Sequence, residues 1–381
     1  MKFEPICCPP ASTWPRGIAS KMSMRAELVR LGLRCLIKRR NHRELSVEQH
    51  RRFATVAERL VPDPPSDTRT LAIDAAGVRA DMILTPASEE ERHVLFLHGG
   101  AFIIGSPNLY RHFTWRVASA AYARVLAVDY RLAPEHPFPA ALEDAFTAYN
   151  WLLAGGADPR RVAIMGDSAG GGLVFSLMLR LRDEGRPLPA AAVALSPWTD
   201  LALTGASLRL NAATDPMLCA DDPPLFVSDY LAGADPRAPY VSPLYGDPAG
   251  LPPTLIHVGS DEVLRDDAVR MADRMRAAAC QVELEIWPRM PHVWQVFVPL
   301  IPEASDAIER IGSFVRKQTG YDGAVRVTRP TPMIWPSGGT RRRAATAPQL
   351  NSNVPAKTTV ALTIAGSGTP SSENWSQTTN K

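Results

Sequence analysis

The sequence predicts an α/β fold in which a mostly parallel central sheet is flanked by helices on both faces. Short apolar segments of strand length alternate with amphipathic helical segments through most of the chain, a pattern typical of parallel sheets covered by helices. Of the 381 residues, 45% are hydrophobic and 21% are charged, which is ordinary for a globular protein and sufficient for a sizeable core.

The predicted strands and helices follow one another in a regular order. The segment TRTLAIDAAGVRADMILTP, at 68–86, predicts two strands joined by an Ala-Gly turn. Further strands are predicted at 94–97, 124–130, 161–165, 190–196, 254–260 and 281–287, and helices at 138–154, 169–185, 265–279 and 304–318.

The parts of the chain that depart from this alternation set the predicted domain boundaries. Residues 21–60 are predicted to form N-terminal cap helices, and residues 205–240 interrupt the main domain, 61–319, as a second part of the cap. The two ends, 1–20 and 320–381, are predicted to be disordered. The C-terminal segment is rich in Thr, Ser, Pro, Asn and Gly and poor in large apolar residues, so it cannot build a core of its own.

The charge distribution argues against a nucleic-acid-binding protein. The formal net charge is +3, but the positive charge is concentrated in 21–43 and 321–381, whereas 44–320 are acidic overall. A basic helix predicted at 24–40 either packs on the main domain or lies on a membrane surface. No apolar run approaches the roughly 20 residues of a membrane span. The five cysteines match no metal or disulfide pattern, so a cytoplasmic protein without a metal is expected.

One serine lies in a turn made almost entirely of small residues. The segment GDSAGGG begins at Gly166 and places Ser168 directly between a predicted strand and a predicted helix. In that context the G-x-S-x-G pattern is typical of a nucleophilic serine on a tight turn. A hydroxyl is a poor nucleophile at neutral pH and requires a base within hydrogen-bond reach. Capping of the helix by Ser168 is the alternative interpretation.

The candidate partners of Ser168 follow later strands, where reactive groups gather in an open parallel sheet. His292 follows the strand at 281–287 and is predicted to be the base, and Asp261 follows the strand at 254–260 and is predicted to orient it. The order Ser, Asp, His along the chain is that of the α/β-hydrolase fold. Other carboxylates remain open for the acidic role: Glu262, Asp266 and Asp267 nearby, and Asp200, which is assigned instead to anchoring the cap.

A glycine-containing segment follows the strand at 94–97 and predicts a site for a negatively charged oxygen. HGGAF begins at His98, which is expected to brace the loop rather than to react. The candidate donors are the backbone N–H groups of Gly99, Gly100, Ala101 and Ala169, the last of which directly follows the nucleophile.

Taken together, these segments resemble the hormone-sensitive-lipase-like branch of the α/β-hydrolases, the bacterial family IV carboxylesterases. The matching strings are HGGAF, DYRLAPEHPFPAALED, GDSAGG, SPWTDL, GSDEVLRDDA and MPHVWQ. DPMLCADD, YLAGADP, SPLYGDPAGLPP and MPHVWQVF are similar to the subgroup of monoterpene ε-lactone hydrolases and acetyl-hydrolases. The resemblance implies Ser168 as nucleophile, Asp261 as acid, His292 as base, a helical cap, and no metal or cofactor. Ala101 stands where many members have a third glycine.

The expected function is hydrolysis of carboxylic esters of short or medium acyl chain through an acyl-enzyme on Ser168. The expected partner is a small-molecule ester or lactone, without nucleic acid or firm membrane association, and a homodimer is compatible with the sequence. The candidate apolar walls of the pocket are Phe102, Trp198, Met217, Leu218, Val293 and Trp294. The alternatives are an ε-lactone hydrolase or acetyl-hydrolase of the same fold, a non-catalytic binding protein, and a peripheral membrane protein.

Overall fold

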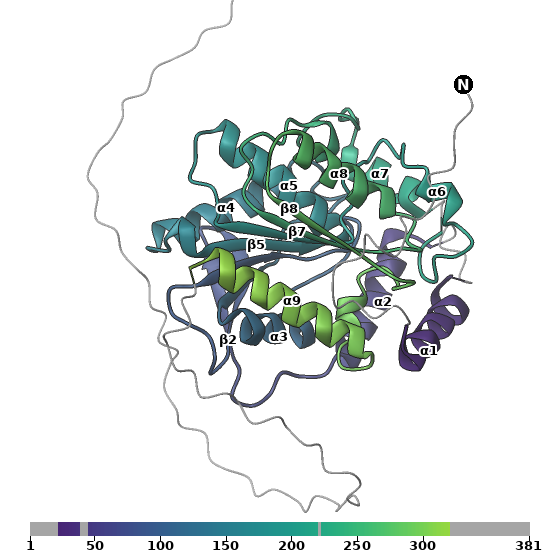
Figure 1. Ribbon diagram of the computed structural model, residues 1–381, viewed down its shortest axis with the longest axis horizontal. Coiled ribbons are helices and arrows are strands. Elements are labelled where there is room, and N and C mark those ends of the chain that lie inside the picture. Colours follow the sequence, from purple (N-terminus) through teal and green to yellow (C-terminus); the bar gives the residue numbers. More distant parts are fainter. Residues whose placement is uncertain (1–21, 39–44, 220–221, 321–381) are drawn as a thin grey trace, which may run out of the picture. The chain divides into compact units, whose positions relative to one another are not determined.

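The structure of the protein, a computed structural model, describes residues 22–38, 45–219 and 222–320, without the side chains of 222–225. The disorder predicted for 1–20 and for the segment beyond 320 lies outside the described residues. All described residues belong to one compact unit. Figure 1 shows a twisted central sheet between two layers of helices, as the alternating sequence pattern predicts.

Eight strands of the described ranges form one sheet in the order β1-β2-β4-β3-β5-β6-β7-β8. β2 is antiparallel to both of its neighbours, β1 and β4, and the other pairs are parallel. The bounds are β1 Arg69–Ala75, β2 Val78–Leu84, β3 His93–Leu97, β4 Arg124–Val128, β5 Val162–Asp167, β6 Ala191–Leu195, β7 Thr254–Gly259 and β8 Val282–Trp287. Every residue of β3, β5, β6 and β7 is buried, which explains why these strands are continuous apolar runs in the sequence.

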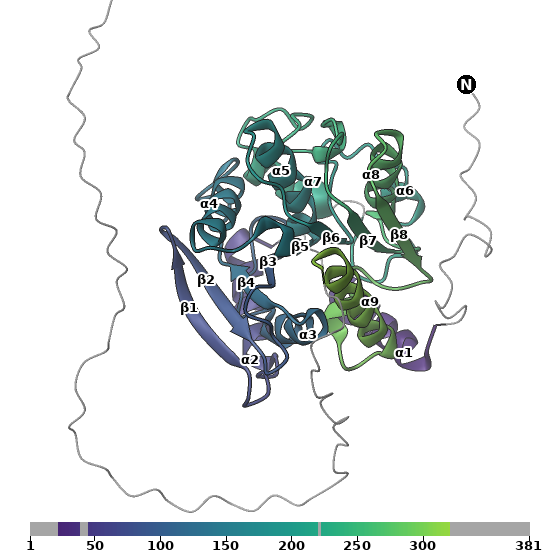
Figure 2. The same ribbon diagram turned by 60° about the vertical axis from the view of Figure 1, so that its left-hand side comes forward.

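Helices cover both faces of this sheet, and each face has its own apolar core. One face carries α4 Ala140–Ala154, α5 Ser168–Asp183 and α8 Arg265–Ala277, and the other carries α3 Arg111–Ala121 and α9 Pro302–Gln318. Figure 2 shows the two layers with the sheet between them. The parallel strands therefore end together at one edge of the sheet, where the loops that follow them can meet.

The sequence did not predict α3. Its sequence, RHFTWRVASAA, is rich in aromatic and β-branched residues of modest helix propensity. Its N-terminus has no side-chain cap, and its C-terminus ends at Tyr122 in the left-handed conformation rather than at a glycine. Burial of Phe113 and Val117 against α9 stabilises this helix, so tertiary packing rather than local preference determines it.

The cap is formed by segments from two distant parts of the chain. The N-terminal part consists of α1 Met24–Leu33, a π-helical turn at Arg34–Lys38, and α2 Val47–Leu60. The second part contains α6 Ser207–Leu210 and α7 Asp222–Leu231. Glu303 of α9 accepts hydrogen bonds from the N–H and the hydroxyl of Ser23, which caps α1. Within the described ranges, every helix is too short or too polar to span a bilayer.

Gly312 allows α9 to lie directly against α3, since a Cβ at this position would collide with the carbonyl group of Ala120. We expect Gly312→Ala to force the two helices apart and to lower the free energy of unfolding by about 1–3 kcal/mol. Gly32→Ala is the matched control, because that added methyl group meets no atom within 4 Å. Thermal melts of the two variants test this, and equal melting temperatures would contradict the expected close contact.

Candidate active site

Ser168 lies on a sharp turn between β5 and α5. Its φ angle is 53°, a left-handed conformation that is rare for residues other than glycine. A Cβ on Gly166 would collide with the carbonyl of Gly170, and a Cβ on Gly170 would collide with the carbonyls of Leu97 and His98. The glycines around Ser168 are therefore required because the turn packs backbone against backbone, which holds the hydroxyl at the carboxyl edge of the sheet.

The structure brings Ser168 and His292 together, as predicted. The Oγ atom of Ser168 is 2.9 Å from Nε2 of His292, and Nδ1 of His292 is 2.7 Å from Oε2 of Glu262. Because the carboxylate can only accept, Nδ1 carries the proton, and Nε2 is left to accept the proton of Ser168. Glu262 is fully buried, and its other oxygen accepts hydrogen bonds from Ser196 Oγ and Gly259 N.

The prediction that Asp261 orients His292 was wrong by one residue. Asp261 turns away from the histidine and forms an ion pair with Arg30 of α1, with 3.0 Å between Oδ2 and Nη2. The adjacent side chains of Asp261 and Glu262 point in different directions, and of these two carboxylates it is Glu262 that contacts His292. The sequence places two carboxylates side by side in GSDEVL, so spacing alone could not choose between them.

The remaining acidic candidates also lie away from His292. Asp200 accepts hydrogen bonds from Thr204 and Tyr245 and pairs with Arg270 of α8, which agrees with the anchoring role assigned to it. Asp266 accepts from the backbone of Ser207, and Asp267 accepts from the backbone of Thr199 and Asp200. These carboxylates fasten the segment after β6 to α8.

The backbone N–H of Gly99 is not free to stabilise an oxyanion, in contrast to the prediction. This N–H donates to Oδ1 of Asp167 at 2.9 Å, and the hydroxyl of Tyr110 donates to the other oxygen at 2.8 Å. No pattern in the sequence singled out Asp167, although it directly precedes the nucleophile. Burial raises the pKa of Asp167 to about 6, against the opposing effect of these two hydrogen bonds. Asp167 thus fixes the loop that carries the predicted donors.

The remaining predicted donors keep a suitable position. Gly100 and Ala101 line the same cavity as Ser168. Ala169 lies in the first turn of α5, where a backbone N–H has no partner within the helix. His98 braces the loop, with Nδ1 2.8 Å from the carbonyl oxygen of Gly99 and its ring stacked on Tyr130. Burial lowers the pKa of His98 to about 4, so this histidine is neutral near pH 7.

A mainly apolar cavity of about 740 Å³ opens beside Ser168 and His292. Its walls come from both parts of the cap and from the segment after β8: they include Ile37, Ala57, Leu60, Met217, Leu218, Phe226, Val293, Val296 and Leu300. Met217, Leu218 and Val293 were predicted pocket walls, and the structure places them here. The other three are core residues: Phe102 stacks on Tyr230, Trp198 is 3% exposed within the same core, and Trp294 packs against His257 and Trp287.

Comparison with known proteins agrees with this geometry. The sequence model of a protein family that is described as having the α/β-hydrolase fold matches residues 94–296. The chain belongs to this α/β-hydrolase family. An acetyl-hydrolase of Streptomyces hygroscopicus is 48% identical to it over 258 residues, which cover 68% of this chain and 84% of that protein.

Similar solved structures indicate which branch of the α/β-hydrolases this chain resembles. An esterase from the bacterial hormone-sensitive lipase family matches 79% of this chain and 100% of its own, with 44% identity and a TM-score of 0.74. The esterase EstE5, soaked with p-nitrophenyl butyrate, matches 78% of this chain and 99% of its own, with 39% identity and a TM-score of 0.75. The predicted resemblance to the hormone-sensitive-lipase-like branch is confirmed, as is the prediction of a carboxylic ester hydrolase.

Two substitutions separate the roles of the adjacent carboxylates. We expect Glu262→Gln to lower kcat for a p-nitrophenyl ester by at least about a hundredfold, because an amide favours the wrong histidine tautomer; the corresponding change in a serine protease costs about four orders of magnitude. Asp261→Asn is the matched control and should lose less than about tenfold, since its amide oxygen can still accept from Arg30. A larger loss in Asp261→Asn would refute the assignment of Glu262.

The pH dependence tests the same contact. Burial by itself lowers the pKa of His292, but the hydrogen bond and charge of Glu262 outweigh this, so its pKa is raised above the ordinary value of 6.5. The neutral form is the base, so kcat/KM of the free enzyme should fall as the pH drops through this raised pKa. Glu262→Gln removes the two largest raising effects and leaves the smaller ones of Asp215 and Asp167, so the acidic limb of the residual activity should move to lower pH. An unmoved limb would contradict this assignment.

Proposed function

We propose that this protein hydrolyses carboxylic esters of short or medium acyl chain through an acyl-enzyme formed on Ser168. The observation that carries the proposal is the continuous hydrogen-bonded series from Ser168 through His292 to Glu262. In this series the hydroxyl faces the free nitrogen of the imidazole, and the buried carboxylate fixes the tautomer that can act as a base.

The chemical steps follow from the positions of these groups. Ser168 Oγ attacks the carbonyl carbon of the ester while its proton moves to Nε2 of His292. The tetrahedral oxyanion is stabilised by backbone N–H groups of Gly100, Ala101 and Ala169. His292 then donates the proton to the departing alkoxide, which leaves as the alcohol. Water, activated by the same histidine, attacks the acyl-enzyme and releases the acid and free Ser168.

The cavity supports an apolar substrate of modest size. Its volume of about 740 Å³ lies within the ordinary range for small-molecule sites, and its walls are mainly aliphatic. The relatives support the same conclusion, since one is named an acetyl-hydrolase and another was soaked with p-nitrophenyl butyrate. The complete hydrogen-bonded series argues against a non-catalytic binding protein, which has no need of a poised nucleophile and base.

A probe of serine nucleophiles tests the mechanism directly. We expect a fluorophosphonate to add once to the protein by intact mass, and Ser168→Ala to abolish both the adduct and the hydrolysis of p-nitrophenyl butyrate. Ser66→Ala is the matched control, because Ser66 is exposed and does not line the cavity. Labelling that persists in Ser168→Ala would place the nucleophile elsewhere. A panel of acyl lengths, lactones and acetylated amines then separates an esterase from a lactonase or an acetyl-amide hydrolase.

A further inference from the structure

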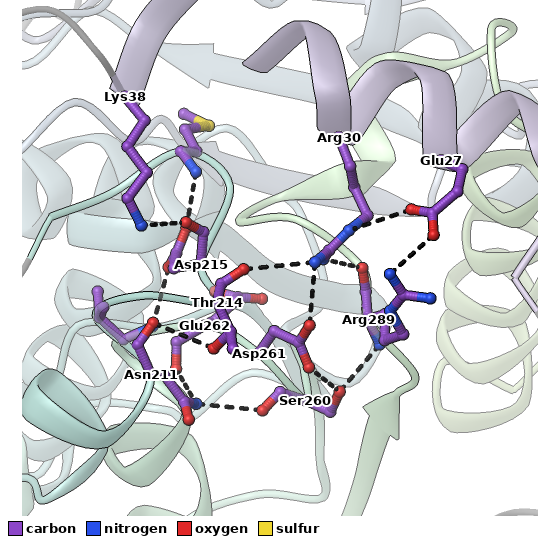
Figure 3. Close-up of polar contacts among 12 residues, drawn as sticks. Glu27, Arg30, Lys38, Asn211, Thr214, Asp215, Ser260, Asp261, Glu262 and Arg289 are labelled. Atoms are coloured by element: carbon purple, nitrogen blue, oxygen red, sulfur yellow. Dashed lines mark hydrogen bonds and ion pairs between the residues drawn. The ribbon is translucent and has the colours of Figure 1, made fainter. Parts of the chain in front are cut away.

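The polar contacts behind the catalytic loops centre on a buried cation from the N-terminal cap. Arg30 lies on α1, and its side chain is only 6% exposed. Figure 3 shows it pointing from α1 toward the loop after β7. A buried guanidinium is stable only when its N–H groups find acceptors, so the partners of Arg30 show what this residue holds in place.

Arg30 contacts three separate segments at once. Its Nη2 is 3.0 Å from Oδ2 of Asp261 and 3.3 Å from the carbonyl oxygen of Thr214, and its Nη1 donates to the carbonyl oxygen of Arg289. Asp261 directly precedes Glu262, and Arg289 lies three residues before His292. One side chain of the cap therefore joins the loop of the acid, the loop of the base and the second part of the cap (Figure 3).

The two catalytic loops are also bound to each other through Ser260. Its hydroxyl donates to Oδ1 of Asp261 and accepts from the N–H of Arg289, at 2.8 and 2.9 Å. Asn211 donates to the carbonyl oxygens of Ser260 and Glu262, at 3.1 and 2.8 Å. These residues form a small hydrogen-bonded network in which Asn211 holds the backbone of Glu262. Arg30 binds two members of this network, Asp261 and Arg289.

A second cation of the N-terminal cap segment, Lys38, binds the part of the network around Asp215. Lys38 donates to the carbonyl oxygens of Ala212 and Asp215. The carboxylate of Asp215 accepts from the N–H of Val263, next to Glu262, and from the N–H groups of the pocket residues Met217 and Leu218. Both parts of the cap and the loop of Glu262 are therefore fixed by one continuous set of contacts.

We propose that Arg30 is a positioning residue that holds the loops of Glu262 and His292 in register, so that correct alignment of the base requires a docked α1. This inference rests on the proposed function, in which the contact between Glu262 and His292 orients the base. The contact lies between two loops from different strands, and an error of about 1 Å in such a geometry can cost about a hundredfold in rate. Arg30 is placed to prevent that error because it binds both loops.

Steady-state kinetics test this role. We expect Arg30→Met to lower kcat by about ten- to a hundredfold for p-nitrophenyl butyrate while KM changes by less than about threefold, because Arg30 does not line the cavity beside Ser168. Arg34→Met is the matched control, since Arg34 is exposed at the end of the same helix, and it should keep wild-type kcat. Arg30→Lys should restore part of the loss, since one ammonium cannot reproduce the fork of contacts. Unchanged kcat in Arg30→Met would overturn the proposal.

A double substitution distinguishes positioning from a general effect on the cap. If Arg30 acts through Glu262, Arg30→Met should lower kcat by less than about threefold when it is added to Glu262→Gln. Losses that multiply would show that Arg30 acts elsewhere and would overturn the proposal.

A proton NMR measurement of the full chain makes the test independent of hydrolysis. The Nδ1 proton of His292, bound to Glu262, should give a downfield signal that is absent in Glu262→Gln. We expect this signal to shift or broaden in Arg30→Met and to remain in Arg34→Met. If the wild-type protein hydrolyses no ester, the proposed function fails, but the signal still reports on the positioning role. A signal unchanged in Arg30→Met would overturn that role.

Discussion

The close contact between the turn at Ser168 and the loop after β3 is the constraint on which the site depends. The left-handed serine is held because Gly166 and Gly170 let the backbone of α5 touch the carbonyl groups at the end of β3. The same contact brings the Gly100–Ala101 segment next to the nucleophile. Strained backbone of this kind costs of order 1–3 kcal/mol and persists only where surrounding structure over-determines it, as the buried parallel strands do here.

Around this turn, buried carboxylates carry distinct tasks that depend on their partners. Glu262 accepts from His292 and raises its pKa, whereas Asp167 accepts from the N–H of Gly99 and the hydroxyl of Tyr110, and its own pKa is raised by burial. Asp261 pairs with a cation of the cap. Each carboxylate lies within a few residues of a strand end, so several carboxylates gather at the edge of the sheet near His292. The assignment of roles follows from hydrogen bonds rather than from proximity alone.

The sequence predicted the fold and most of the site because both depend on local pattern. Apolar runs in the sequence predict the strands and their order along the chain. The residues directly after these runs predict Ser168 and His292. The acid could not be chosen, since Asp261 and Glu262 are adjacent and only the path of the loop decides which one faces His292. Phe102, Trp198 and Trp294 were placed in the pocket because composition does not distinguish a wall from a core. The helix α3 was missed because packing stabilises it.

The long separation between Arg30 and Arg289 has a consequence for biosynthesis. The two residues that meet behind the site are 259 positions apart. At translation rates of about 5–20 residues per second, α1 leaves the ribosome roughly 10 to 50 s before its partner is made. During that interval the helix has neither the loop of Glu262 nor that of His292 to dock on. The nucleophile turn can form from residues already synthesised, but the aligned base must wait for the last strand, so a nascent chain carries the serine long before it can use it.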